Sequence, residues 1–334
     1  MTPRTLQEQL NNYLTDVHAI ERQALVQMRR APKLGGDPAI SEAFARHLTE
    51  TEEHERLIRG CLAARGAGTA PVKDVAAGVI GWGLSAFAAT QPDTPGKLVA
   101  HAYSYEHMEK AAYRLLGLLA ERLAETEVVD VAGRIEGQER DMAARLESLF
   151  ELAVEASLGA LGSPDPAGQL DKYLADAHAL EEQAAHLLRR GPRLAGAEGL
   201  ASAYHEHLQE TIGHRQAVAA RLQAHGSRAS AVKDAALRLG ALNWSVFFAT
   251  QPDTPAKLCA FAYAFEHLEI AGYELLRRVA ERAQDAETVR LVERVLAGER
   301  AAAERLESLF PAALESLFPA ALDASLRDLR LPAR

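Results

Sequence analysis

The nine residues YEHMEKAAY, Tyr105–Tyr113, decide the fold of this chain, and they return as FEHLEIAGY at Phe265–Tyr273, 160 residues later. The segments ATQPDTP and RLESLF also occur twice at this offset. Aligned without a gap, residues 10–150 match residues 170–310 at about 63 of 141 positions. Chance does not produce such a match, so the two halves of the chain share one fold.

The repeat divides the chain into two predicted domains, residues 1–160 and 163–334. The joint between them, GALGSPDPAG at 159–168, is short. We therefore expect the two halves to pack together as a pseudo-dimer within the chain. The sequence leaves open whether the chain also forms a homo-oligomer.

The composition is that of a globular protein and argues against several classes of function. Hydrophobic residues make up 48% and charged residues 25% of 334, which is an ordinary balance. The net charge of −9 argues against nucleic acid and membrane as partners. Two cysteines cannot build a disulfide framework, and the N-terminal stretch MTPRTLQEQLNNYL has no apolar signal region. These features predict a cytoplasmic protein.

Apolar residues recur with helical spacing along each half. In the first half they predict long helices over residues 6–30, 40–64, 94–124 and 127–158, with a shorter apolar helix over 72–88. The loops inside the first and last pairs are short, and the connection between the pairs is long. This is the topology of a ferritin-like four-helix bundle. The predicted fold class is all-α: two tandem ferritin-like bundles, each with a long crossover that carries the short helix.

Capping residues and prolines mark several helix boundaries. Thr5 and Glu8 form a capping box ahead of the first helix. Asp165 stands at the cap of the matching helix in the second half. Near the C-terminus the segment ESLFPAAL occurs twice in succession, and its prolines, Pro311 and Pro319, should interrupt any helix there.

Polar residues interrupt the apolar face of every predicted long helix. Five glutamates and three histidines per half fall inside these apolar stripes and point inward. In the first half they are Glu21, Glu50, Glu106, Glu109, Glu139, His18, His47 and His54. In the second half they are Glu181, Glu210, Glu266, Glu269, Glu299, His178, His207 and His214.

Carboxylates clustered in a bundle core need compensating positive charge. Removing one from water costs at least several kcal/mol, and the inward faces carry no lysine or arginine. Bundle cores of this kind bind di-iron or di-manganese centres. At a rise of about 1.5 Å per residue, Glu21, Glu50, Glu109 and Glu139 fall at similar depths. Glu106 lies a turn further out, which leaves ligation and a hydrogen-bonding role both open for it.

We therefore predict up to one dinuclear Fe or Mn site per half. The predicted ligands are Glu21, Glu50, His54, Glu106, Glu109, Glu139, Glu181, Glu210, His214, Glu266, Glu269 and Glu299.

Other polar residues near these sites are expected to have supporting roles. We expect His18 and His47 to contact the ligands or to pack in the core. Tyr113 and Tyr273 are expected to pack in the core, with donation to a metal-bound carboxylate as the alternative. His107 lies off the inward stripe, which predicts a place on the helix surface or at an interface.

Three motifs taken together resemble a known family. HLTETEEH at 47–54, EHMEKAAY at 106–113 and the region around Glu139 are similar to the YciE/YciF-like family of ferritin-like bacterial stress proteins. The resemblance covers nearly the whole of each half. It implies a ferritin-like bundle with a dinuclear metal site and an association with stress responses.

The ligand set departs from the familiar di-iron pattern. That pattern places Glu-x-x-His on two helices, whereas the second helix here spaces glutamate and histidine four apart. On the fourth long helix, Met142 and Ala302 stand where a second histidine is usual. Gln138 and Gly298 stand where the family often has a further acid. The predicted site is rich in carboxylates and poor in histidines.

These features lead to two kinds of function. The first is a di-metal protein that reacts with O₂ or peroxide, as a ferroxidase or peroxide scavenger in a stress response. The same scaffold also supports oxygenation of an organic substrate. The second is a non-catalytic metal-binding structural stress protein. The sequence leaves open whether the chain is an enzyme, namely a di-iron or di-manganese oxidoreductase.

Overall fold

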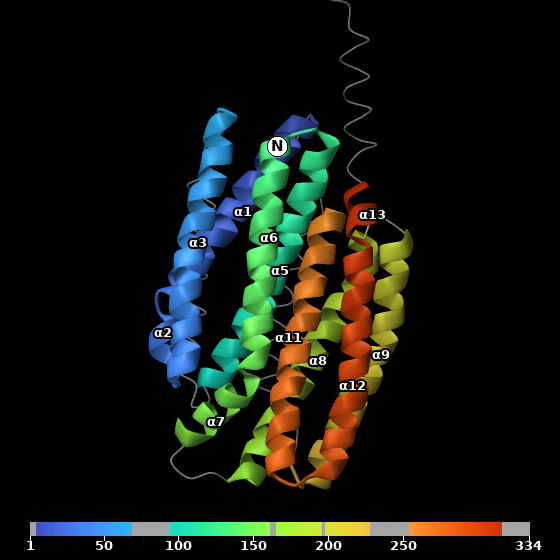
Figure 1. Ribbon diagram of the computed structural model, residues 1–334. Coiled ribbons are helices and arrows are strands. Elements are labelled where there is room, and N and C mark those ends of the chain that lie inside the picture. The colour runs from blue at the N-terminus through green and yellow to red at the C-terminus, as the bar shows by residue number, and fades with distance from the viewer. Residues whose placement is uncertain (1–4, 69–93, 161–164, 196–197, 228–253, 316–334) are drawn as a thin grey trace, which may run out of the picture.

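The computed structural model describes residues 5–68, 94–160, 165–195, 198–227 and 254–315. Within these ranges every regular element is a helix, which confirms the all-α class. The first half contains α1 (Leu6–Met28), α2 (Ala31–Leu34), α3 (Pro38–Ala64), α5 (Thr94–Arg122), α6 (Thr126–Ser148) and α7 (Phe150–Ala160). The second half contains α8 (Pro166–Leu194), α9 (Glu198–Ala224), α11 (Thr254–Arg282), α12 (Ala286–Ser308) and α13 (Phe310–Glu315), and the labels follow Figure 1.

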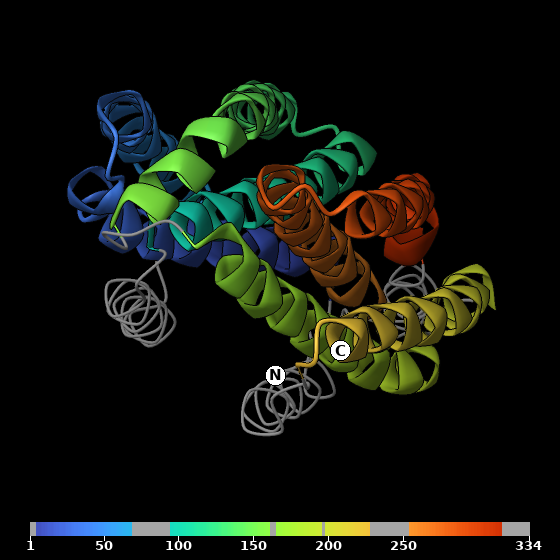
Figure 2. The same ribbon diagram turned by 90° about the horizontal axis from the view of Figure 1, so that it is seen from below.

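Each half is a bundle of four long helices. In the first half α1 packs against α3 and α5, and α6 packs against the same two helices. In the second half α8 and α12 each pack against α9 and α11. Figure 2 shows the two bundles side by side. The expected short helix at 72–88 lies outside the described residues. None of the described helices is both long and apolar enough to cross a membrane.

The helix ends follow the capping signals in the sequence. The Oγ1 of Thr5 accepts a hydrogen bond from the Glu8 backbone N–H at 3.1 Å. Asp165 occupies the N-cap of α8, but its side chain makes no capping hydrogen bond. A glycine with positive φ stands two residues after the last residue of α3 and of α9, Gly66 at 63° and Gly226 at 74°. Glycine adopts this conformation without the steric cost that other residues incur.

The single helix expected over residues 127–158 is wrong, because the structure divides it into α6 and α7. The backbone N–H of Leu149 bonds to the carbonyl of Leu146 at 3.0 Å, which tightens the last turn of α6. The chain then turns so that α7 packs against α5 and α11. Phe150 is fully buried there, with its ring 5.3 Å from that of Tyr103.

The matching break in the second half has a local cause in the sequence. α12 ends at Ser308 and α13 begins at Phe310, next to Pro311, as the proline led us to expect. Pro319 lies outside the described residues. Like α7, α13 crosses the boundary between the halves, since it packs against α11 and α5.

The two halves meet through contacts between α5 and α11, and reciprocal ion pairs link α5 to α8 and α11 to α1. The Nζ of Lys97 lies 3.4 Å from Asp176, and the Nζ of Lys257 lies 2.8 Å from Asp16. Lys257 matches Lys97 and Asp176 matches Asp16 at the offset of 160, so each half donates the lysine to one contact and the aspartate to the other. Such reciprocity is the property of an isologous interface. The chain is therefore arranged as an internal pseudo-dimer.

A histidine pair stands at the centre of this interface. The rings of His107 and His267 stack with centroids 3.5 Å apart and planes 17° from parallel. Each Nδ1 lies 2.8 Å from the backbone carbonyl four residues earlier, to which it donates. Burial lowers the pKa of both rings, that of His267 to about 4. His107 is thus an interface residue, one of the two positions expected for it.

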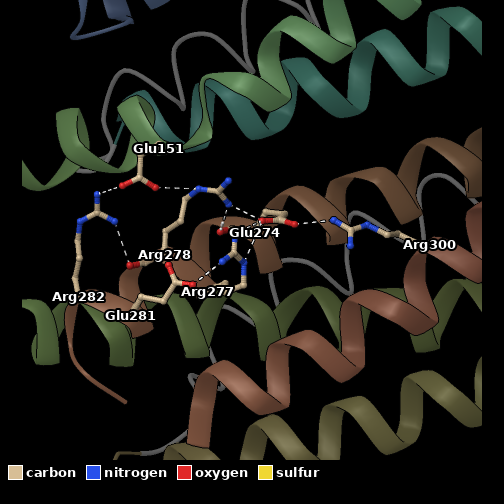
Figure 3. Close-up of polar contacts among 7 residues, drawn as sticks. All are labelled: Glu151, Glu274, Arg277, Arg278, Glu281, Arg282 and Arg300. Atoms are coloured by element: carbon tan, nitrogen blue, oxygen red, sulfur yellow. Dashed lines mark hydrogen bonds and ion pairs between the residues drawn. The ribbon is translucent and has the colours of Figure 1, made fainter. Parts of the chain in front are cut away.

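A network of glutamates and arginines also joins the halves (Figure 3). The Glu274 carboxylate, 9% exposed, accepts hydrogen bonds from Arg277, Arg278 and Arg300. Arg278 also contacts Glu151 of α7 at 3.3 Å. Burial alone raises the pKa of Glu274, but Arg278 and Arg277 outweigh it and lower that pKa overall. The network ties α7 of the first half to α11 of the second.

Candidate metal centre

Four helices of the first half direct ionisable side chains to one region of the bundle core. All six of these side chains are 1% exposed or less. They are Glu21 on α1, His47 and His54 on α3, Glu106 and Glu109 on α5, and Glu139 on α6. Helical spacing explains the grouping, because residues three, four or seven apart share one face of a helix.

The side chains form two groups that share one glutamate. His47, Glu106, Glu109 and Glu139 make the first group, and Glu21 and His54 make the second with the same Glu139. In each group the potential ligand atoms lie within 4.8 Å of one another.

The shared glutamate directs its two oxygens to different groups. The Oε1 of Glu139 lies 2.8 Å from the Nδ1 of His54, and its Oε2 lies 3.4 Å from the Nε2 of His47. Glu139 therefore connects the two donor groups.

The second half repeats the arrangement. Glu299 lies 2.8 Å from His214 through one oxygen and 3.4 Å from His207 through the other. The first group here contains His207, Glu266, Glu269 and Glu299, and the second contains Glu181, His214 and Glu299. The two halves of the chain therefore arrange their potential metal ligands in the same way.

The chemistry of these donors fits a divalent metal. Both carboxylate oxygens of Glu109 and Glu269 are buried without a hydrogen-bond partner. Buried polar atoms without partners are costly, since the energy of removing them from water is not recovered. Carboxylate and imidazole are donors that iron and manganese accept. The buried groups in each half could therefore hold metal ions.

The pKa values of the first cluster show how much charge is crowded there. Burial, with the nearby Glu139 carboxylate, raises the pKa of Glu21 to about 8. Burial raises the pKa of Glu139 to about 7 despite its contact with His54. Burial and then Glu139 raise the pKa of Glu109 well above its usual value. Without metal the cluster therefore holds protons at neutral pH, and metal binding would displace them.

The structure brings together five of the six predicted ligands in each half. In the first half these are Glu21, His54, Glu106, Glu109 and Glu139, and in the second half Glu181, His214, Glu266, Glu269 and Glu299.

Glu50 and Glu210 stand outside both groups. Their side chains are 27% and 43% exposed, and each lies 3.0 Å from the Nδ1 of a histidine, His47 or His207. The structure places these two histidines inside the groups, although the sequence led us to expect only supporting contacts from them. Because His47 and Glu50 share one helix face three residues apart, helical spacing alone does not separate them.

Tyrosines contact the carboxylates on α1 and α8. The Tyr113 hydroxyl donates to the Oε1 of Glu21, and the Tyr273 hydroxyl donates to Glu181 at 2.5 Å. Donation to a carboxylate was the alternative expected for these residues. His18, which lies outside both groups, contacts a glutamate of α3 at 3.2 Å.

Two helical bundles, each with a buried carboxylate–histidine cluster, define a tandem ferritin-like protein. The sequence matches the family described as "Domain of unknown function (DUF892)" at residues 5–159 and again at residues 168–317. The chain belongs to this family, with one copy of the domain in each half. No solved structure matches the chain.

Proposed function

We propose that each half binds a dinuclear centre of Fe or Mn, and that the loaded protein reacts with O₂ or peroxide. The observation that carries this proposal is the shared glutamate, whose two oxygens face two separate donor groups in both halves. A bound pair of such metals supplies redox change and open coordination positions. A role in the stress response rests on the resemblance to YciE/YciF-like proteins.

The surrounding residues have positioning roles in this proposal. Glu50 contacts the Nδ1 of His47 at 3.0 Å and so presents the Nε2 atom to the cluster. Tyr113 fixes the Glu21 carboxylate in the same way. Partners of this kind orient ligands and tune their basicity. The sequence-based proposal that Glu50 is itself a ligand would require its side chain to turn inward.

Metal analysis of the purified protein tests the proposed centres. We expect about four metal ions per chain from cells grown with added iron and manganese, because dinuclear carboxylate centres hold two metals each. The double variant Glu139→Ala/Glu299→Ala should lose most of them. The exposed glutamates Glu127 and Glu304 serve as matched controls, since changing them to glutamine should leave the metal content unchanged. Metal-free wild-type protein, or full loading of the double variant, would contradict the proposal.

Reactivity separates the redox proposal from the structural alternative. The metal-loaded wild-type protein should consume Fe(II) in the presence of O₂, or should consume H₂O₂, faster than the Glu139→Ala/Glu299→Ala variant does. The buried, histidine-poor cores favour one alternative, in which bound metal only neutralises the carboxylates and stabilises the bundles. A metal-loaded protein that is silent in both assays would support that alternative or oxygenation of an organic substrate.

A further inference from the structure

The two clusters are alike in their donors but differ in two neighbouring residues. Three residues after the shared glutamate, α6 has Met142, whereas α12 has Ala302. Immediately before the shared glutamate, α6 has Gln138, whereas α12 has Gly298. In both positions the second half carries the smaller residue.

A cavity lies beside the donors of the second half. It has a volume of about 10 Å³ and is lined in part by His207, Glu266 and Ala302. A neighbouring cavity of about 30 Å³ reaches Glu266 from the side of α8 and α11. A volume of roughly 10–15 Å³ holds one water molecule, so the two spaces fit molecules of one to three heavy atoms. In the first half the longer Met142 side chain is buried at the position that matches Ala302.

The second difference exposes a histidine. In the first half the Nε2 of His54 contacts the Gln138 amide oxygen at 3.1 Å, and the His54 side chain is fully buried. In the second half His214 is 17% exposed. A Cβ atom added to Gly298 would lie 3.3 Å from the Nε2 of His214. The missing side chain at Gly298 therefore leaves this edge of His214 uncovered.

We propose that the two centres differ in access, so that the second-half centre takes up a small exogenous ligand while the first-half centre is closed. The ligand class is a molecule of one to three heavy atoms that binds metal directly and enters through the two cavities that meet at Glu266, one of them beside Ala302. In the first half Met142 is buried at the place of Ala302, and Gln138 contacts the Nε2 of His54. A metal centre needs an open position to react with a ligand. This inference rests on the proposed metal centres.

Azide binding to Co²⁺-loaded single-centre variants tests the inference. Glu139→Ala leaves the second centre intact, and Glu299→Ala leaves the first. Both proteins are loaded with Co²⁺, whose visible spectrum reports its ligands, and titrated with azide. We expect azide to change the spectrum of Glu139→Ala at a concentration on the order of tenfold lower than for Glu299→Ala, or to change only the former. Circular dichroism checks that both variants fold.

Residue exchange between the halves supplies the matched controls. Adding Gly298→Gln and Ala302→Met to Glu139→Ala should abolish the azide response while Co²⁺ stays bound. Adding Gln138→Gly and Met142→Ala to Glu299→Ala should create a response. Equal azide responses in the two single-centre variants, or no response in either, would overturn this inference without contradicting the proposed metal centres. Failure of either variant to bind Co²⁺ would instead count against the proposed function.

Discussion

At the scale of single residues, the buried carboxyl groups link pH to stability. Glu21 has a pKa raised to about 8 by burial and by Glu139, against a usual value of 4.5. Below pH 4.5 the carboxyl is protonated in both folded and unfolded protein. As pH rises toward 8, only the unfolded chain releases the proton readily, so unfolding becomes more favourable. The pKa of His207, raised to about 10 overall because nearby Glu266 outweighs the lowering effect of burial, acts in the same direction.

We therefore predict that the metal-free protein loses stability between pH 6.5 and 8.5. The lowered pKa values of His107 and His267 have the opposite effect, since they make the folded protein more stable as pH rises. Above pH 6.5 this effect ends, because both rings are then neutral in the folded and in the unfolded protein. Thermal unfolding of chelator-treated protein measures the effect, and Glu21→Gln should flatten the slope. Added Mn²⁺ should remove most of the loss, since metal stabilises the ionised carboxylates. A melting temperature that rises with pH over this window would contradict the prediction.

The buried carboxylate–histidine cluster was predictable from sequence where several helices agreed. Glu21, Glu109 and Glu139 each interrupt an apolar stripe, and their distances from the loops place them at one depth. The choice between His47 and Glu50 was not predictable. The two lie three residues apart on α3, and contacts with α5 and α6 place His47 in the cluster.

At the scale of helices, the glycine that ends α3 offers a clean test of backbone conformation. The Gly66 N–H bonds to the Ala63 carbonyl at 3.0 Å, and the Ala67 N–H bonds to the Leu62 carbonyl at 2.9 Å. This is the Schellman pattern, which requires positive φ at Gly66. A Cβ there would meet no atom within 4 Å, so a substitution would cost backbone strain and nothing else.

Gly66→Ala should lower the free energy of unfolding by about 1 kcal/mol, because alanine disfavours the left-handed conformation. Gly60 lies in the interior of the same helix, is exposed and is equally free of neighbours. Gly60→Ala should raise the free energy of unfolding by roughly 0.5–1 kcal/mol, since alanine favours helix. Urea unfolding of both variants checks the pair. Effects of the same sign would show that backbone conformation does not control this helix end.

The break between α6 and α7 shows where helix prediction fails. Residues around Leu149 include no glycine or proline, and helical periodicity continues through them. The break arises because Phe150 packs beside Tyr103 and α7 turns onto α5 and α11. The local sequence does not reveal such tertiary contacts. Pro311, at the matching place in the second half, could have predicted the break in the first half as well, because the two halves share one fold.

At the scale of the whole molecule, duplication has produced an interface that is symmetric in part only. The lysine–aspartate contacts and the stacked histidines are reciprocal. The network around Glu274 is not, because the first half has Arg114 at the matching position. Fusion in one chain lets each half change independently, as it also does near the two clusters. Specialisation of one half is therefore available to this protein and not to a symmetric dimer of identical subunits.

The asymmetric network can be tested by replacing Glu274, which should lower the free energy of unfolding. Glu274→Ala would leave Arg277, Arg278 and Arg300 without their shared, largely buried partner. Breaking a fully buried pair costs about 3–5 kcal/mol, and exposed pairs contribute about 0–1 kcal/mol. Because Arg300 is 49% exposed, we expect a loss of about 1–3 kcal/mol in urea unfolding.

The matching variant in the first half supplies the control for this prediction. Arg114 is exposed, so Arg114→Ala should change the free energy of unfolding by less than about 0.5 kcal/mol. Glu274 and Glu151 both contact Arg278, so a double-mutant cycle between them should show non-additivity. Additive effects would mean that the network does not couple α7 of the first half to α11 of the second. Other contacts between the halves, such as those of α5 with α11, would then hold them together.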